Sequence, residues 1–172
     1  MRNLILHQLE LRDEEIFLEA MQQSQSFYGP WMYAPTTHDE FVDFYFCYNQ
    51  TNQRCYLLLN KHNDLVGLFS LSEITRGIFQ NAYLGFCANV NFAGLGLISA
   101  GLKLLFKEVF INLDLHRLEA NIQPENSASL NLVKTNGFSY EGLSKRYLNV
   151  NGEWRDFQRW AITVEDWQDN PR

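Results

Sequence analysis

Two short segments of the chain carry the residues best suited to ligand binding. In the first, Gly94 and Gly96 stand between a strand-like stretch and a long amphipathic stretch that begins at Leu97. The first turn of a helix has backbone N–H groups without intrahelical partners, so a phosphate can bind there if glycine lets the backbone come close. The spacing therefore predicts a phosphate-binding turn. The alternative is that the two glycines only shape a strand-to-helix connection.

The second segment reads Pro124-Glu125-Asn126-Ser127-Ala128-Ser129 and precedes a short helical pattern closed by Gly137. Asn126 is a favoured N-cap residue, and Ser129 falls in the first turn of the helix that follows. Together the two segments indicate one cofactor site. Helix capping alone could also account for Asn126, and Ser129 could be simply a small residue in a first turn.

The hydrophobic pattern predicts the elements that must position these segments. Short apolar or alternating runs indicate strands, and apolar residues at helical spacing indicate amphipathic helices. We expect strands over residues 4–11, 55–59, 65–71, 83–90, 117–122, 140–150 and 153–163, helices over residues 14–23, 96–110 and 127–135, and a further helix that opens at Thr37. Residues 24–35 are expected to be irregular. The order βααβββαβαββ predicts an α/β (α+β) fold with a mixed sheet covered by helices.

Local signals support several of these boundaries. Asp13 is placed to cap the first helix, and Thr37 with Glu40 three residues later forms a capping-box pattern. Gly137 is expected to end its helix in a left-handed conformation. Asn151-Gly152 between two strand-like runs is a strong hairpin signal.

Composition narrows the class of protein. The chain has 172 residues, 46% of them hydrophobic, and no linker-like stretch, so we expect a single domain over residues 1–172. The net charge of −6 argues against a nucleic-acid surface and permits a cationic substrate. The longest nearly apolar run, residues 93–106, contains Lys103 and is shorter than the roughly 20 residues that span a bilayer. We therefore expect no membrane partner.

The cysteines and histidines indicate neither a disulfide framework nor a metal site. The three cysteines, Cys47, Cys55 and Cys87, are odd in number and lack a Cys-x-x-Cys pair, and no signal peptide precedes them. The four histidines are dispersed without metal-ligand spacing. We expect a metal-free protein in the reducing cytoplasm.

Several sequence blocks, in this order, resemble one superfamily. They are Ser72-Glu73-Ile74 with Arg76-Gly77, Tyr83-Leu84-Gly85-Phe86, Leu115-His116-Arg117-Leu118-Glu119-Ala120, the run of residues 126–138, and Glu141-Gly142 followed by Trp154-Arg155-Asp156. The chain resembles the GNAT superfamily of acetyl-CoA-dependent N-acetyltransferases, in the branch similar to ribosomal-protein N-terminal acetyltransferases. The best match runs over residues 65–163. The resemblance implies a mixed, mostly antiparallel central sheet flanked by helices.

The resemblance also implies which residues bind acetyl-CoA. They are Phe86, Gly94, Leu95, Gly96, Leu97, Ile98, Ser99, Asn126 and Ser129, with Lys134 as a candidate for the nucleotide end. An ordinary solvated lysine is an equally good reading of Lys134. The chain departs from the family pattern at Ala93 and Leu95, which remove side-chain contacts and leave a phosphate site built from main chain. It also has Ile98 at the final position of the pattern, where the family has a small residue.

The chemistry expected from the resemblance needs a neutral amine, a stabilised carbonyl oxygen and a protonated leaving thiol. Many relatives have a tyrosine general acid where this chain has Val133. The resemblance to the ribosomal-protein branch implies that a serine, here Ser129, or water serves the leaving thiolate instead. Glu119 is the candidate general base, although the adjacent Arg117 allows a structural ion pair instead. Glu73 is the alternative base.

The acceptor side is expected around Trp31, Tyr33, Glu73 and Tyr147. Trp31 and Tyr33 belong to an aromatic segment with Phe27 and Tyr28, and a satellite hydrophobic core is the alternative for this segment.

The function expected is transfer of acetyl from acetyl-CoA to a primary amine, namely the N-terminal amine of a protein or peptide, by a monomer or homodimer. An α-amine with a pKa near 8 is roughly a tenth neutral at pH 7, whereas a lysine near 10.4 is almost fully charged, so an N-terminus needs less help from a base. The alternatives are acetylation of a small amine such as a drug or polyamine, and a catalytically weak acyl-CoA-binding or sensing module.

Overall fold

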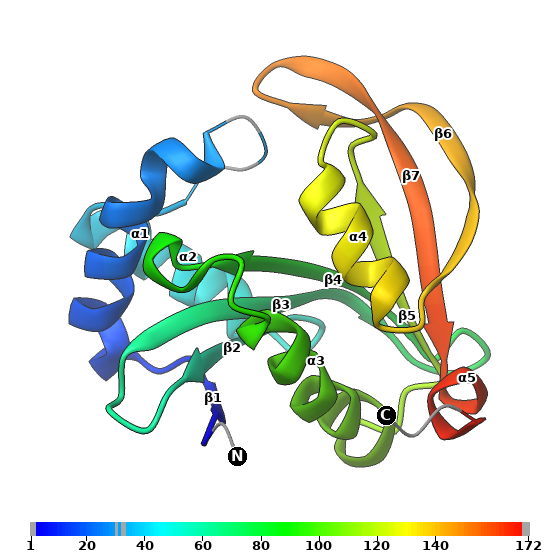
Figure 1. The fold of residues 1–172 in the computed structure, drawn as a ribbon, viewed down its shortest axis with the longest axis horizontal. Coiled ribbons are helices and arrows are strands. Elements are labelled where there is room, and N and C mark those ends of the chain that lie inside the picture. Colours follow the sequence, from blue (N-terminus) through cyan, green and yellow to red (C-terminus); the bar gives the residue numbers. More distant parts are fainter. Residues whose placement is uncertain (1–2, 30, 32–33, 170–172) are drawn as a thin grey trace.

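The computed structural model describes residues 3–29, 31 and 34–169. Within this part of the chain, seven strands form one sheet in the order β1-β2-β3-β4-β5-β7-β6 (Figure 1). The strands are β1 (Ile5–Gln8), β2 (Arg54–Leu59), β3 (Leu65–Thr75), β4 (Asn81–Ala88), β5 (Arg117–Ile122), β6 (Ser139–Val150) and β7 (Glu153–Thr163). β4 and β5 are parallel, and the other neighbouring strands are antiparallel.

Helices connect and flank these strands. They are α1 (Glu14–Tyr28), α2 (His38–Tyr48), α3 (Leu97–Lys107), α4 (Ser127–Thr135) and α5 (Val164–Asp169), with short 3-10 turns at η1 (Leu11–Asp13) and η2 (Val90–Phe92) and a π-helical turn, η3 (Glu108–Asn112), after α3. The predicted mixed, mostly antiparallel sheet flanked by helices is confirmed. α5 adds one helix to the predicted order.

The sheet carries a hydrophobic core on each face. On one face, Leu58 and Phe69 pack with Leu102 and Leu105 of α3, in the core to which Val133 of α4 also belongs. Gly101 lets α3 come close, because a Cβ there would lie 2.5 Å from Leu58 Cδ2. On the other face, α1 and α2 form a second core with alternate residues of β2 and with Leu65 and Leu68 of β3. β2 is buried on both faces, which explains its continuous apolar run.

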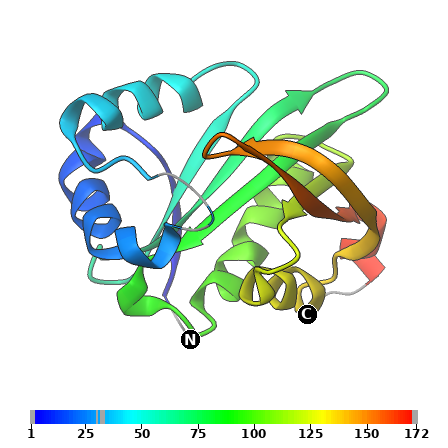
Figure 2. The ribbon, with the colours of Figure 1, turned by 90° about the horizontal axis from the view of Figure 1, so that it is seen from above.

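The second face is only partly covered. α1 and α2 pack against β3, and Figure 2 shows them over one half of the sheet, with the β6–β7 hairpin arching beyond the other half. Over β5 and β7 this face has no covering helix among the residues that the structure describes. We call this area the open half of the second face.

Several local predictions are confirmed. β5 and α4 have the predicted bounds, and Thr37 and Glu40 form a reciprocal capping box at α2. Gly137 has φ +91°, and the N–H of Phe138 donates back to the carbonyl of Val133 at 3.1 Å, which closes α4.

Other boundaries were predicted wrongly. α1 continues to Tyr28, so residues 24–28 are helical where an irregular segment was expected. Tyr28 packs inward and its hydroxyl donates to the carbonyl of Ala88, a tertiary contact that extends the helix. Asp13 makes no side-chain cap of α1, because its carboxylate accepts from the N–H of Glu10 and pairs with His7. The predicted strand over residues 83–90 is shifted to 81–88.

No helix in the described part of the chain is both long enough and apolar enough to cross a membrane. The described residues also contain no group of three or more His, Cys, Asp and Glu side chains arranged to hold a metal ion.

Candidate active site

The central feature of the site is an opening in the sheet between β4 and β5. Their parallel pairing covers only residues 81–83 and 117–119, with Tyr83 opposite Glu119 as the last pair. Beyond this point the two strands diverge, as Figure 1 shows. β4 continues beside β3, and β5 continues beside β7. Beyond Tyr83 and Glu119, the facing edges of β4 and β5 are therefore not paired with each other.

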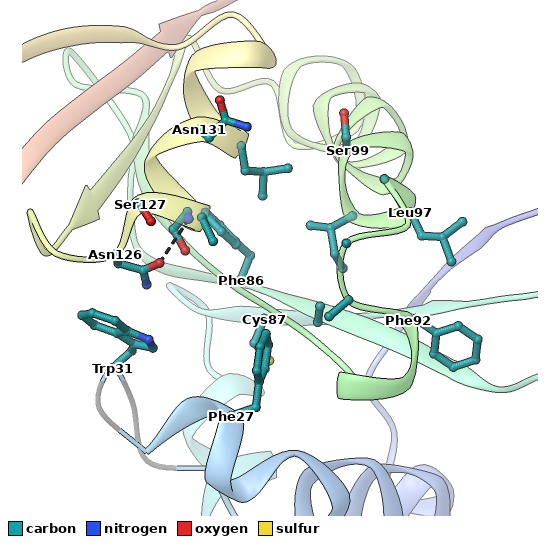
Figure 3. A pocket seen from close by; sticks show the side chains of 18 of the residues that line it. Phe27, Trp31, Phe86, Cys87, Phe92, Leu97, Ser99, Asn126, Ser127 and Asn131 are labelled. Atoms are coloured by element: carbon teal, nitrogen blue, oxygen red, sulfur yellow. Dashed lines mark hydrogen bonds between the residues drawn. The ribbon is translucent and has the colours of Figure 1, made fainter.

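A cavity of about 550 Å³ lies at this opening. Its walls come from the C-terminal end of α1, the end of β4, the turn before α3 and the first turns of α4 (Figure 3). Phe27 and Trp31 lie on the α1 side of the cavity, and Asn126 and Ser127 lie on the α4 side. The starts of two helices therefore face one space.

The glycine turn forms one wall. Gly94 and Gly96 have φ values of +74° and +69°, and Gly96 is the N-cap of α3. A positive φ is costly for other residues. The N–H groups of Leu97, Ile98 and Ser99 lie in the first turn of α3, where no intrahelical acceptor exists. A Cβ on Gly94 would meet no atom within 4 Å, so the glycine is required by backbone conformation and the space beside it is open.

Asn126 forms the facing wall. Its Oδ1 accepts a hydrogen bond of 3.1 Å from the backbone N–H of Ser129, so it caps α4, as Figure 3 shows. The capping interpretation of Asn126 is therefore correct, and Asn126 still lines the cavity. Ser129 lies on the same wall. Capping and ligand contact are compatible here, because the cap uses the oxygen of the amide and leaves its Nδ2 as a donor.

The floor of the cavity contains two titratable groups that stay neutral. Burial, the largest cause, raises the pKa of the Tyr28 hydroxyl far above its usual range and that of the Cys87 thiol to about 12. Neither group ionises near neutral pH. The thiol of Cys87 is a weak nucleophile in this state, because the thiolate is the reactive form.

The cavity brings together most of the predicted cofactor residues and one predicted acceptor residue. Its lining includes Phe86, Gly94, Gly96, Leu97, Ile98, Ser99, Asn126, Ser129 and Trp31. Leu95 is absent from the lining, and 54% of its surface is exposed. Tyr33 lies outside the described residues.

Lys134 lines a neighbouring cavity of about 700 Å³ with Lys103 and Lys107 of α3. The two cavities share Ser99 and Thr135, so the lysines lie next to the main site without lining it. A cluster of cations at this place suits an anionic group. The i,i+4 spacing of Lys103 and Lys107 was available in the sequence, but their proximity to Lys134 depends on the packing of α3 beside α4.

Glu119 lies on the open half of the second face and not on the cavity wall. Its Oε1 accepts from Arg117 Nε at 3.0 Å, and its Oε2 accepts from Arg159 Nη2 at 2.9 Å. Burial acts to raise the pKa of Glu119, but the hydrogen bonds and charges of the two arginines outweigh it, and the pKa lies below its usual value. Glu119 is thus an ion-paired carboxylate, the alternative that Arg117 had suggested.

Glu73 and Tyr147 were the other predicted acceptor residues. Glu73 is exposed, has φ +50°, and interrupts the pairing of β3 with β4. Tyr147, on β6, packs edge-on against Phe157. Burial, together with the neighbouring Tyr147 hydroxyl, raises the pKa of Tyr83. Neither Glu73 nor Tyr147 lines the cavity.

Sequence reasoning missed Arg159 and Asn121. Asn121 follows Glu119 by two positions on β5, so strand alternation alone places the two side chains on one face. Arg159 offered no local signal, because it meets Glu119 only through the pairing of β5 with β7.

The sequence matches the acetyltransferase (GNAT) domain family over residues 3–139. The ribosomal protein uS5-alanine N-acetyltransferase of Escherichia coli (strain K12) is 34% identical over 104 residues, which are 60% of this chain and 54% of that protein. The spermidine N(1)-acetyltransferase of the same strain is 27% identical over 99 residues, 58% of this chain and 53% of that protein. The chain spans about half the length of these two curated relatives.

Among solved structures, Mycobacterium smegmatis RimJ in complex with CoA-disulfide has a TM-score of 0.86 against this chain and is 25% identical to it. The similarity covers 95% of this chain and 83% of that one.

Proposed function

Because this chain belongs to the GNAT acetyltransferase family, we propose that it transfers the acetyl group of acetyl-CoA to the N-terminal α-amine of a protein or peptide. The observation that carries this proposal is the cavity at the opening between β4 and β5, onto which the starts of α3 and α4 both face. The uS5-alanine N-acetyltransferase and the RimJ complex with CoA-disulfide support the donor and the class of acceptor.

The residues of the cavity fit coenzyme A. The main-chain N–H groups of residues 97–99, at the positive end of the α3 dipole, suit a pyrophosphate, and the positive φ of Gly94 and Gly96 permits close approach. Asn126 Nδ2 can donate to an amide carbonyl of the pantetheine arm. The neighbouring lysines, Lys103, Lys107 and Lys134, suit the negative charge at the nucleotide end.

Acetyl-CoA supplies an acetyl thioester, and the chain must provide a neutral amine and a proton for the leaving sulfur. We assign the second task to Ser129, which lies in the first turn of α4 on the cavity wall. Val133, at the position where many relatives have a tyrosine, is fully buried in the core and has no group to donate.

The neutral amine is supplied largely by the acceptor itself. Glu119 is a weak base, because its lowered pKa and its two arginine partners favour the ionised carboxylate. Glu73 remains the alternative base, acting through water, on an exposed bulge. An α-amine near pKa 8 is already roughly a tenth neutral at pH 7, so this site suits it far better than a lysine amine near 10.4.

A small polyamine is the second candidate acceptor. The similarity to spermidine N(1)-acetyltransferase and the net charge of −6 both favour it.

The test is a panel of acceptors with detection of released CoA thiol. Acetyl-CoA is expected to raise the Tm, and short peptides with a free N-terminus are expected to react faster than N-blocked peptides that carry lysine. Equal rates for these two peptide classes would contradict the proposal that the acceptor is an α-amine. Faster turnover of spermidine would favour the polyamine, and stabilisation without turnover of any amine would favour a binding or sensing module.

A further inference from the structure

The open half of the second face is lined by polar side chains at alternate positions of three strands. Ala82 of β4, Leu118 and Ala120 of β5, and Ile162 of β7 belong to the core under α3 and α4. Because side chains alternate along a strand, the odd-numbered neighbours of these residues point to the opposite face. These are Asn81 and Tyr83 on β4, Arg117, Glu119 and Asn121 on β5, and Arg159 on β7. A row of polar residues on a half-covered sheet face is suited to a polar ligand.

Glu119 organises this row. Its side chain is 9% exposed, and both of its oxygens are engaged: Oε1 by Arg117 and by Asn81 Nδ2 at 3.0 Å, and Oε2 by Arg159. Arg117 also pairs with Glu141 of β6. The two carboxylates are therefore matched by two guanidinium groups, and no carboxylate of this network is left for a cationic ligand.

Three polar atoms of the row are buried without a partner among the described residues. They are the donor Arg159 Nε and the acceptors Asn81 Oδ1 and Asn121 Oδ1. Arg159 and Asn121 are directly opposite each other in the pairing of β7 with β5. A buried polar group without a hydrogen bond costs about 1–3 kcal/mol, so an adjacent orphaned donor and acceptor need a physical reason.

The position of Arg159 and Asn121 in the sheet gives a physical reason for their unpaired groups. Tyr83 and Glu119 form the last residue pair before β4 and β5 diverge, and Asn121 follows on the edge of the opening. β5 then leads through Gln123 to Asn126 on the cavity wall. A short stretch of chain, residues 121–126, thus links the open half of the second face to the cavity wall.

We propose that Arg159 and Asn121 bind the first peptide group of the acceptor, with Arg159 Nε donating to its carbonyl and Asn121 Oδ1 accepting from its N–H. Glu119 is the positioning residue that holds Arg159. This proposal rests on the proposed function and sharpens it. A polyamine has no carbonyl for Arg159 and would bring an ammonium group beside a guanidinium, so the pair selects a peptide over a polyamine.

The first test needs no variant. A short peptide with a free N-terminus is compared with the matched ester, in which an oxygen replaces the first peptide N–H. The wild-type protein is expected to show a kcat/KM on the order of tenfold higher for the peptide, because the ester leaves Asn121 Oδ1 unpaired. Equal kcat/KM values overturn the assignment of Asn121.

The second test uses variants. Arg159→Lys keeps the charge but removes Nε, and it is expected to raise the peptide KM on the order of tenfold with little change in kcat. Asn121→Leu is expected to erase the difference between peptide and ester. The acetyl-CoA Kd should stay unchanged in both. Arg12→Lys is the matched control, because Arg12, on η1, pairs with Glu10 and its side chain is 73% exposed.

The position of Glu119 gives a third test. Glu119→Gln is expected to raise the peptide KM while kcat is kept, because the substitution loosens Arg159, whereas loss of a general base would lower kcat. Unchanged peptide KM values in both Arg159→Lys and Asn121→Leu overturn the proposal while the proposed function stands. Failure of the wild-type protein to acetylate any peptide contradicts the proposed function itself.

Discussion

The Ser99 hydroxyl, in the first turn of α3, donates a hydrogen bond of 2.8 Å to Asn136 Oδ1 just beyond the end of α4. Asn136 Nδ2 in turn donates to the carbonyl of Leu132 at 2.8 Å. Ser99 therefore ties together the two helices whose first turns form facing walls of the cavity. The Ser99 hydroxyl is therefore engaged between the helices, and its backbone N–H is the group that faces the predicted main-chain phosphate site.

Ser99→Ala removes this tie. A single hydrogen bond of this kind contributes about 1 kcal/mol, so the free energy of unfolding is expected to fall by about that amount. The Kd for acetyl-CoA should rise with it, because the distance between the two walls is less well held. Urea unfolding and calorimetric titration measure the two effects, and Ser99→Thr, which keeps the hydroxyl, is the control. A rise in Kd without loss of stability would instead indicate direct contact with the ligand.

Ser129→Ala is expected to lower turnover more than acetyl-CoA affinity, if Ser129 protonates the leaving thiolate. Loss of a proton donor typically costs on the order of a hundredfold in kcat. Ser127→Ala is the matched control, since Ser127 lines the same cavity from the same helix turn. Unchanged kcat in Ser129→Ala would remove Ser129 from the mechanism.

Asn126 combines two roles that substitution can separate. Asn126→Ala loses the cap of α4 and is expected to lower the free energy of unfolding by about 1 kcal/mol, whereas Asn126→Asp keeps a capping oxygen and most of that stability. Asp lacks the Nδ2 donor, so both variants should weaken acetyl-CoA binding. Normal affinity in Asn126→Asp would show that Asn126 only caps the helix.

Glu119 makes stability depend on pH. Its folded-state pKa lies below the value of about 4.3 expected in the unfolded chain, so the ion pairs stabilise the fold above that value. This contribution is lost as the pH falls through the lower folded value. Glu119→Gln should therefore be less stable than wild type at pH 7, and the difference should shrink toward pH 3. Urea midpoints at the two pH values test this, and a difference that stays constant would contradict the lowered pKa.

The pH dependence of kcat/KM should follow the acceptor amine. Because the pKa of Glu119 lies below its usual value, its titration cannot produce a limb near neutral pH. The limb is expected near the pKa of the peptide α-amine, about 8, and should move with that pKa in peptides with a more acidic N-terminus. A limb that stays in place across such peptides would point to a titrating group of the protein.

The sequence predicted the elements whose causes are local. Residues 127–135 form a helix because Asn126 caps one end and Gly137 closes the other, and all of these signals lie within one short segment. The hairpin at Asn151-Gly152, with φ values of +53° and +86°, has the same local origin. The fold was predicted from the order of the family-like sequence blocks, because this order indicates how the elements are arranged in the sheet.

Only the tertiary structure decided the roles of residues whose partners lie far away along the chain. Glu119 is an ion-paired carboxylate because the pairing of β5 with β7 brings in Arg159, and Tyr28 extends α1 because it packs at the end of β4. Local propensity specifies short-range hydrogen bonds and dihedral angles, so it identified the helix starts and the glycine turn. Burial and charge pairing, which set the pKa of a carboxylate and the position of a cavity, depend on the packing of elements that the sequence separates.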